Sequence, residues 1–365
     1  MRARIPFLEP DLPDAAPLAE DMQRIVASAR LSNGGPFEES LCDRIAARVG
    51  AAHCIAVANA TIGLMLAMRA TARPGATLAV MPSFTFPATA LAARWAGLEP
   101  LFCDIDERTW QPRVPIESLR PFADSIALLV PCNTFGAPCD IEQWIEIAED
   151  LGVPLLVDSA AGLGGRYRDG RAIGGAGATE VFSMHATKSF GVGEGGLVVT
   201  ADAALAARLR TMRNFGLGED GVCVEPGLNG KLSELHAAVA CRVLDGFDAA
   251  LQRRAAIAER YRRRLAPLAV QLQDGAELSP CQAASIRLRG ADRGLVRERL
   301  LREGVETRHY FSPPLHRQPL FASCRALGAL EGTTAVAADI LALPMSTRRT
   351  DEEIDRICDA LARCL

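Results

Sequence analysis

Between Asp43 and Thr200, short apolar segments alternate with stretches in which apolar residues recur at helical spacing. Each apolar segment has the length of a strand and has turn-forming residues nearby. Strands that alternate with helices indicate an α/β fold with a mostly parallel sheet that helices cover on both faces. The predicted strands are Cys54–Val57, Leu78–Met81, Leu101–Cys103, Ala127–Val130, Val153–Val157, Val181–Ser183 and Leu197–Val199.

The pattern changes after Leu232. Residues Ser233–Leu268 have the spacing of one long helix. Its arginine clusters are expected on a solvated face. These arginines are Arg253, Arg254 and Arg262–Arg264.

A second α/β pattern follows through Leu365, and the segment Ser346-Thr-Arg-Arg-Thr-Asp-Glu-Glu is a capping signal for the last helix. We therefore predict a large domain of mostly parallel mixed sheet at residues 1–245 and a smaller C-terminal α/β domain at residues 246–365.

Composition fits a soluble enzyme with a sizeable core, since 49% of the 365 residues are hydrophobic and 23% are charged. A net charge of −4 argues against a general nucleic-acid binder. No run approaches the roughly 18 apolar residues of a membrane span, and the N-terminus lacks a secretory signal. The eleven cysteines are scattered without a Cys-x-x-Cys pair, so neither a disulfide framework nor a metal site is expected. These features predict a cytoplasmic enzyme.

Only two of the 40 basic residues are lysines, Lys188 and Lys231, and all the others are arginines. A chain that makes its positive charge with arginine should keep lysine where arginine cannot act. Arginine stays protonated, whereas a lysine amine can lose its proton and attack a carbonyl to form a Schiff base. Lys188 lies in the apolar, glycine-rich segment Phe-Ser-Met-His-Ala-Thr-Lys-Ser-Phe-Gly-Val-Gly-Glu-Gly-Gly (182–196), which disfavours a solvated surface role.

A lysine of this kind predicts a pyridoxal phosphate site. Such a site also needs a carboxylate that keeps the pyridine nitrogen protonated, a phosphate cup and an apolar surface against the ring. Asp158 ends an apolar strand and precedes small residues that would admit a ligand, although it would also serve as an N-cap. The backbone amides at Ala60 and Thr61 open a helix and can hold a phosphate, and a simple helix cap is the alternative.

Two further residues are candidates for the same site. Ser183, five residues before Lys188, is a candidate phosphate contact. Phe86 is a candidate for stacking on the cofactor ring, but core packing is the commoner role of phenylalanine, and Phe84 lies in the same segment.

Two other features compete with this interpretation. Lys231 is an alternative Schiff-base residue, although Gly230 before it and a long helix after it favour a loop or helix-start role. Gly191, Gly193 and Gly196 match the dinucleotide fingerprint G-x-G-x-x-G, but they precede a strand instead of opening a helix. We therefore interpret these glycines as residues that let the backbone turn tightly beside the lysine.

The chain resembles the DegT/DnrJ/StrS family of sugar aminotransferases, which has the aspartate-aminotransferase-like fold of pyridoxal-phosphate enzymes, type I. The similarity covers nearly the whole chain, and the ordered set of segments is specific although no single one is decisive. The segments are Ile5-Pro-Phe-Leu-Glu-Pro, Leu31-Ser-Asn-Gly-Gly-Pro, Asn59-Ala-Thr61, Pro82-Ser-Phe-Thr-Phe-Pro-Ala-Thr89, Phe182-Ser-Met-His-Ala-Thr-Lys188, Gly193-Glu-Gly-Gly196, Gly227-Leu-Asn-Gly-Lys-Leu-Ser-Glu, Arg308-His-Tyr-Phe-Ser-Pro-Pro-Leu-His-Arg-Gln-Pro and Leu343-Pro-Met.

The resemblance implies that pyridoxal 5′-phosphate is bound to Lys188, with Asp158 as the partner of its pyridinium nitrogen. Asn229 matches an asparagine that reaches the phosphate of the neighbouring subunit's cofactor, which implies a homodimer with shared active sites. The loop that holds His309 and Tyr310 is similar to one that helps form the nucleotide-sugar pocket. The positions that match cofactor-binding residues are Ala60, Thr61, Phe86, Asp158, Ser183, Lys188 and Asn229.

The family's activity implies transfer of an amino group from a donor such as glutamate to a nucleotide-linked keto sugar. An aminocyclitol aminotransferase stays open as an alternative, and so does a non-catalytic regulatory protein of the same fold, although the complete set of site residues argues against it. Related sugar deoxygenases carry histidine at the position of Lys188, which disfavours that activity. A nicotinamide dehydrogenase is the remaining rival, and NAD binding would reveal it.

Two departures from the family pattern touch the pocket. The family often has glutamine or histidine where this chain has Ala161, close to the phenolic oxygen of the cofactor, so that contact is missing or comes from elsewhere, with Ser159 as the candidate. The family also commonly carries Val-His before the Gly-x-Pro turn, where this chain has Val130-Pro-Cys-Asn-Thr-Phe-Gly136. Both changes bear on the substrate more than on the reaction type.

Overall fold

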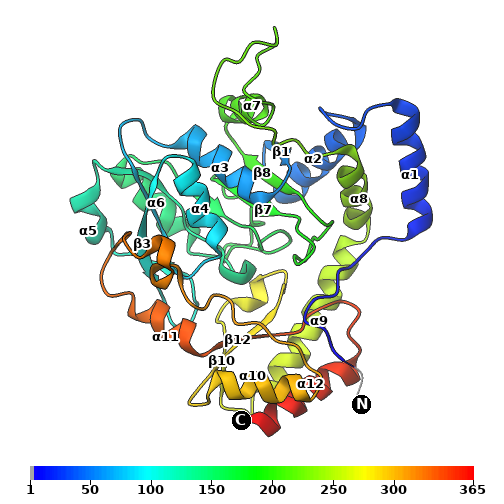
Figure 1. Cartoon of the computed structure of the whole chain (residues 1–365), viewed down its shortest axis with the longest axis vertical. Coiled ribbons are helices and arrows are strands. Elements are labelled where there is room, and N and C mark those ends of the chain that lie inside the picture. Colours follow the sequence, from blue (N-terminus) through cyan, green and yellow to red (C-terminus); the bar gives the residue numbers. More distant parts are fainter. Residues whose placement is uncertain (1–3) are drawn as a thin grey trace.

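The computed structural model describes residues 4–365, and its larger part is built on two sheets that lie edge to edge (Figure 1). Their strands are β1 (His53–Val57), β2 (Leu78–Pro82), β3 (Glu99–Ile105), β4 (Pro112–Arg113), β5 (Ile126–Leu129), β6 (Leu156–Asp158), β7 (Thr179–Ser183), β8 (Gly196–Thr200) and β11 (Arg325–Ala326). The strand orders are β1-β8-β7-β6 and β11-β3-β2-β5, and parallel bridges from Leu129 to Leu155 and from Cys132 to Asp158 join β5 to β6. Most pairs are parallel, and β8 runs antiparallel to both of its neighbours.

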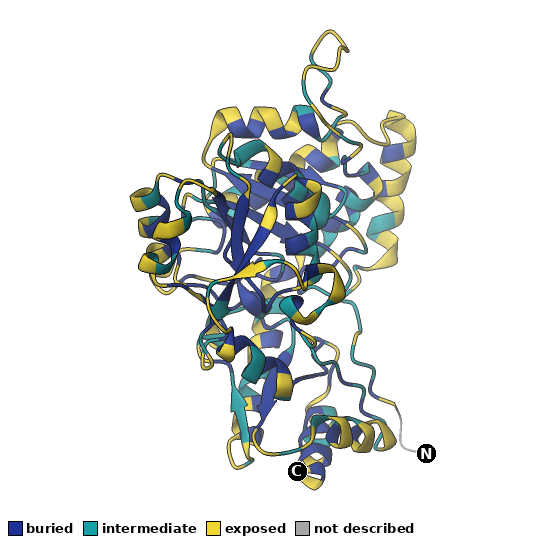
Figure 2. Ribbon diagram, turned by 60° about the vertical axis from the view of Figure 1, so that its left-hand side comes forward, coloured by how far each residue is buried: buried dark blue, intermediate teal, exposed yellow. Residues whose placement is uncertain are grey.

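Side chains of each strand alternate between two hydrophobic cores, one on each face of the sheet. In β1, Cys54 and Ala56 face the core that contains α2 (Pro36–Val49), α6 (Ile141–Leu151) and α8 (Glu234–Asp245). Ile55 and Val57 face the core that contains α3 (Ala60–Thr71), α4 (Pro87–Trp95) and α7 (Ala203–Met212). Figure 2 shows the buried strands between helices whose outer faces are exposed. The prediction of a mostly parallel sheet covered on both faces is confirmed.

The predicted strands agree with the structure except near Pro154. The segment Val153–Val157 was expected to be extended throughout, but β6 begins only at Leu156. Proline has no amide proton for a ladder, and Leu155 forms only an isolated bridge to Leu129. The amide of Val153 is used to close α6 by donating to the carbonyl of Ala148 at 3.0 Å.

The C-terminal part forms a third core around an antiparallel sheet. The last helix begins with a capping box between Thr350 and Glu353, as its sequence predicted. Ile5 packs in this core, while Phe321 packs in the core of α3 and α4, so the chain crosses between the parts more than once. The division at 245 and 246 stays a prediction. The elements of this part are α9 (Phe247–Leu265), β9 (Val270–Leu272), β10 (Ala284–Leu288), α10 (Arg293–Arg302), β12 (Ile340–Leu343) and α12 (Asp351–Cys364). Val336 and Ala337 of α11 (Glu331–Asp339) pack instead in a smaller core with Phe84 and Trp110.

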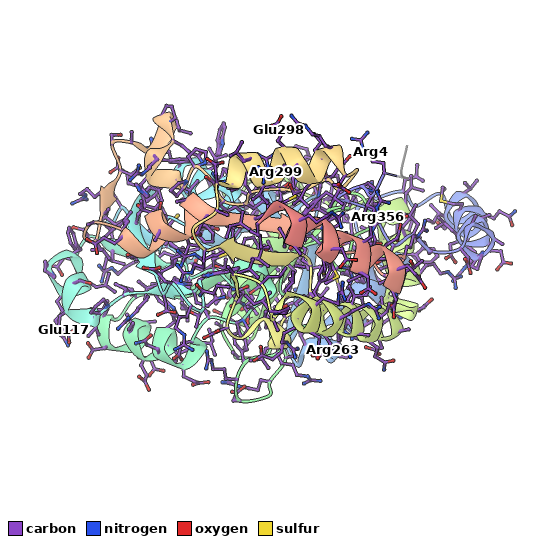
Figure 3. The ribbon with its side chains drawn as sticks, turned by 90° about the horizontal axis from the view of Figure 1, so that it is seen from below. Arg4, Glu117, Arg263, Glu298, Arg299 and Arg356 are labelled. Carbon is purple, nitrogen blue, oxygen red and sulfur yellow. The ribbon has the colours of Figure 1, made fainter. Side chains whose placement is uncertain are left out.

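The predicted helix over Ser233–Leu268 is two helices, because Gly246 ends α8 and begins α9. The expectation that all its arginines are solvated is also wrong. Arg254 is only 4% exposed and donates to Asp11 at 2.9 Å, because it shares a buried helix face with Ile257 and Tyr261. Arg263, by contrast, projects from the surface (Figure 3).

The larger part also contains α1 (Ala15–Ser28) near the N-terminus and the short α5 (Ile116–Leu119) beside α6. Among residues 4–365, no helix has both the length and the apolar character that a membrane crossing requires.

Candidate active site

The candidate residues meet where strand ends and helix starts come together on one face of the sheet. Asp158 is the last residue of β6 and Ser183 the last of β7. Because Leu156 and Val181, two residues earlier in each strand, face the core of α3 and α4, Asp158 and Ser183 point to that same face. Phe86 is the N-cap of α4 and therefore borders the same region.

The carboxylate of Asp158 is buried and held by two donors. The Thr89 hydroxyl donates to Oδ2 at 2.6 Å, and the Ala160 amide donates to Oδ1 at 3.1 Å. Burial raises the pKa of Asp158, while the two hydrogen bonds and the charge of Lys188 act in the opposite direction. Thr89 belongs to a segment that the sequence singled out, but no sequence signal assigned it this contact.

Lys188 lies in the loop that connects β7 to β8. The amide of Ala186 donates to the carbonyl of Gly193 at 2.9 Å and closes this loop. Gly193 has a φ of 110°, a conformation that suits glycine, so the tight turn beside the lysine is present as predicted. Burial lowers the pKa of Lys188, and the charge of Asp158 partly opposes that shift. A partly desolvated amine with a lowered pKa loses its proton more readily and becomes a nucleophile.

The start of α3 is the candidate phosphate cup. The Asn59 side chain caps the helix, and the amides of Ala60 and Thr61 belong to the first turn, which has no intrahelical acceptors for them. Gly196 lies against this turn, since a Cβ there would come within 2.6 Å of the Ala60 nitrogen. Ser183 pairs with Gly196 in the sheet, so the Ser183 hydroxyl belongs to the same corner as these amides.

The two phenylalanines of the segment before α4 have different environments. Phe84 is fully buried and packs edge-on against Phe135 and Phe311. Phe86 is 56% exposed, and its ring centroid lies 6.3 Å from that of Phe311. Phe84 is thus a core residue, whereas Phe86 has a ring face free to cover a ligand.

The loop with His309 and Tyr310 lies beside this aromatic group, because Phe311 follows directly. Tyr310 is partly exposed and contacts the Phe7 ring edge-on, with centroids 6.2 Å apart. Burial lowers the pKa of His309, and Arg297 is among the arginines that lower it further. Arg293 and Arg297 of α10 and Arg308 therefore place positive charge around this loop.

The competing lysine has a different setting. Lys231 donates to the side chain of Asn214 at 2.9 Å and lies 4.6 Å from the ring centroid of Phe215. No carboxylate of residues 4–365 forms an ion pair with it. Asn229, two residues earlier, is exposed and forms a bridge with Asn214.

The expectation that Ser159 replaces the family's polar contact at position 161 is wrong. Ser159 follows Asp158 and faces the opposite side of the sheet, where its hydroxyl donates to Glu180 and accepts from the Asn133 amide at 2.9 Å. Ala161 is buried and contributes no polar side chain.

The donor set fits pyridoxal phosphate on its chemistry. It offers an amine with a lowered pKa, a buried carboxylate, helix amides beside a hydroxyl and an exposed phenyl ring. On a mixed sheet of this topology, these groups define a pyridoxal-phosphate-dependent transferase of fold type I.

The chain belongs to the DegT/DnrJ/EryC1/StrS aminotransferase family, whose model matches residues 14–362. It is therefore a pyridoxal-phosphate-dependent aminotransferase, as its resemblance implied. The G-x-G-x-x-G match has no dinucleotide role, because its glycines lead into β8 and not into a helix.

Three relatives illustrate the similarity. The chain is 38% identical to Protein Rv3402c of Mycobacterium tuberculosis, over 98% of this chain and 89% of the relative. It is 26% identical to the dTDP-4-amino-4,6-dideoxy-D-glucose transaminase of Escherichia coli, over 98% of each chain. The crystal structure of DesI in the presence of its TDP-sugar product superimposes with a TM-score of 0.92 at 37% identity, and the match covers 100% of this chain and 93% of DesI.

Proposed function

We propose that this aminotransferase moves an amino group from glutamate to a nucleotide-linked keto sugar and so makes an amino sugar. Two relatives support a sugar substrate, since one is named for a dTDP-linked amino sugar and another was crystallised with a TDP-sugar product. The observation in this chain that carries the proposal is that the half-buried Lys188 and the buried Asp158 lie close enough for each charge to act on the pKa of the other group.

Bound pyridoxal phosphate supplies a ring that accepts electrons from the carbon next to the amino group. Lys188 would hold the cofactor through its amine, and the same amine, when free, would be the group that carries a proton between the donor carbon and the cofactor. Asp158 keeps the ring nitrogen protonated. The amides of Ala60 and Thr61 bind the phosphate together with the Ser183 hydroxyl.

The substrate side of the proposal rests on charge and on a second subunit. Arg293, Arg297 and Arg308 act on His309 and give its loop a positive field, which attracts the diphosphate of a nucleotide sugar. Asn229 is exposed on a loop, as expected of a residue that reaches the neighbouring subunit's phosphate. The proposed assembly is a homodimer with shared sites, in which Tyr310 borders the sugar.

Replacement of the attachment residue tests this proposal. We expect Lys188→Ala to lose the visible absorbance of lysine-bound cofactor and all glutamate-dependent amination, whereas Lys231→Ala serves as the matched control and keeps both. The assay uses a panel of nucleotide-linked keto sugars and keto cyclitols, with the product read by NMR. Borohydride reduction followed by peptide mapping should place the cofactor on Lys188. A linkage at Lys231, or amination by Lys188→Ala, would contradict the assignment.

The carboxylate has its own test. Asp158→Asn should still attach the cofactor, because Lys188 is unchanged, but proton abstraction should slow by on the order of 100-fold or more. Stopped-flow absorbance with glutamate alone measures this half-reaction without a sugar substrate. An unchanged half-reaction rate would remove Asp158 from its proposed role.

A further inference from the structure

Two threonine hydroxyls form a chain that ends on Asp158. Thr89 Oγ1 lies 2.6 Å from Oδ2 of Asp158, and Thr85 Oγ1 lies 2.9 Å from Thr89 Oγ1. Beyond Thr85, the sulfur of Cys132 lies 3.4 Å away. Thr85 is 1% exposed and Thr89 is fully buried, so water does not compete for these bonds.

The proton positions follow from the acceptors. The Thr89 hydroxyl has one proton and three oxygens within reach: Asp158 Oδ2, Thr85 Oγ1 and the Phe86 carbonyl at 3.2 Å. Asp158 Oδ2 is the nearest of the three, and a carboxylate oxygen is a stronger acceptor than a hydroxyl or a carbonyl, so the proton points to Asp158. Thr85 then donates to Thr89, since that oxygen is a better acceptor than the sulfur of Cys132. Both hydroxyl dipoles are thereby aligned toward the carboxylate.

The helix that carries Thr89 acts in the same direction. Thr89 is the third residue of α4, so its bond to Asp158 places the carboxylate at the first turn of that helix. The positive end of the helix dipole stabilises an anion there. With the Ala160 amide on Oδ1, each carboxylate oxygen already has one protein donor and keeps lone pairs for another.

We propose that Thr89, backed by Thr85, is a positioning residue that holds Asp158 ionised and oriented toward the ring nitrogen of the bound cofactor. The inference rests on the proposed function, because it takes Asp158 as the partner of that nitrogen. Thr89 itself touches neither cofactor nor substrate in this assignment. It acts through the carboxylate, on which it fixes the rotamer and the charge.

The other ionisable groups that act on Asp158 come from two neighbouring segments. Lys188, on the loop after β7, favours the ionised carboxylate. Burial raises the pKa of the thiol of Cys132, on the turn after β5, and the charge of Asp158 raises it further. Burial of Asp158 opposes ionisation, and the Thr89 hydroxyl is the largest influence that counteracts it. Glu180 lies on the opposite face of the sheet, with Ser159.

Four variants of the full chain test the inference. Thr89→Val removes the hydroxyl with little change of shape, and Thr89→Ser keeps the hydroxyl. Thr85→Val removes only the second link. Thr179→Val is the matched control, since it removes a buried hydroxyl that pairs with Thr200 at 3.0 Å and not with a carboxylate. Two readouts are needed: the pH dependence of the pyridoxal phosphate dissociation constant, and the ¹⁵N chemical shift of cofactor labelled at the ring nitrogen.

Cofactor binding should weaken below a certain pH, and this part of the pH profile is its acid limb. In Thr89→Val we expect the acid limb to move up by about one pH unit, which corresponds to about tenfold weaker binding at those pH values. The ring-nitrogen signal should lose its protonated shift over the same pH range. Thr85→Val should move both readouts less and in the same direction, while Thr89→Ser and Thr179→Val should match the wild type. A lower melting temperature with an unmoved limb would show a merely structural role and overturn the inference.

If Thr89→Val does not fold, Thr85→Val tests the inference in its place. A pyridoxal phosphate dissociation constant of Thr85→Val with the same pH dependence as the wild type would then overturn the inference. The Asp158→Asn variant separates this inference from the proposed function. An Asp158→Asn enzyme that keeps the wild-type limb would refute the role of Asp158 itself. An Asp158→Asn enzyme without the limb, together with a Thr89→Val enzyme that keeps it, would refute only the role of Thr89.

Discussion

Asp158 and Ser159 are neighbours in the chain, yet their side chains lie in separate polar networks on opposite faces of the sheet. Asp158 is bound by Thr89 on the face of α3 and α4. Ser159 is bound to Glu180 on the other face, where the Gly174 amide also donates to Glu180 at 2.8 Å. Burial raises the pKa of Glu180 to about 7, and these hydrogen bonds only partly counteract it. The pKa of Glu180 therefore lies near neutral pH, although this carboxyl group does not belong to the site.

This titration predicts a pH dependence of stability. A carboxyl group whose pKa is about 7 when folded and near its ordinary 4.5 when unfolded contributes stability below the unfolded pKa. That contribution is lost as the pH rises through 7. We expect Glu180→Gln to remove up to about 3 kcal/mol from the difference in free energy of unfolding between pH 4 and pH 8. Urea denaturation at both pH values measures the free energy of unfolding of the wild type and of Glu180→Gln. If its change between pH 4 and pH 8 is the same in the two proteins, the prediction is wrong.

At the residue scale, the sequence identified groups whose chemistry is unusual for their position. Lys188 stood out by its rarity and Asp158 by its place at a strand end. Thr89 did not, because its bond to Asp158 joins residues 69 positions apart, and that proximity depends on how α4 packs on β6. The choice between Phe84 and Phe86 was open for a similar reason, since only tertiary packing buries one ring and exposes the other.

At the element scale, the phosphate cup depends on close packing between α3 and β8. Gly196 begins β8 against the first turn of α3, and a Cβ there would lie 2.6 Å from both the Ala60 nitrogen and the Asn59 carbonyl carbon. Both of these are backbone atoms and cannot rotate away. A side chain at position 196 would therefore push the helix start away from Ser183.

We expect Gly196→Ala to weaken cofactor binding by about tenfold. This is the effect of losing one hydrogen bond to the charged phosphate, which contributes about 1.5 kcal/mol. Gly246→Ala is the control, since it has a φ of −99° and nothing within 4 Å of an added Cβ. Fluorescence titration with pyridoxal phosphate gives both dissociation constants. Equal affinities in the two variants would show that the first turn of α3 tolerates a methyl group at position 196.

Element boundaries were predictable where apolar runs and turn residues coincide, as in β1, β2 and β7. They were not predictable where one residue's effect depends on packing. Gly246 is compatible with a continuous helix, and only its backbone angles, φ −99° and ψ 2°, show that the helix is interrupted there. The burial of Arg254 likewise depends on Asp11, far away in the sequence.

For the whole molecule, the segment between α7 and α8 indicates where a second subunit would lie. It projects from the top of the molecule (Figure 1) and exposes three apolar side chains, Phe215, Val222 and Val224. Exposed apolar groups that cluster on one projection are typical of a surface covered in an assembly. Asn229 lies at the base of the same segment, so the proposed contact with a neighbouring phosphate and the apolar projection belong to one surface.

Shared sites predict that two inactive variants restore each other. Lys188→Ala removes the attachment residue, and Asn229→Asp places a negative charge against the neighbour's phosphate. In a mixed dimer, one site carries both changes and the other carries neither. An equal mixture that exchanges subunits freely should therefore recover about a quarter of the wild-type activity.

The matched control combines Lys188→Ala with Asp158→Asn, because both residues act in the site of their own subunit. Each site of that mixed dimer carries one of the two changes, so the mixture should show no more activity than Asp158→Asn contributes alone. Sedimentation velocity on each mixture checks that dimers form. If the first pair recovers no activity while its dimers do form, Asn229 serves the cofactor of its own subunit, and the proposed sharing of sites is wrong.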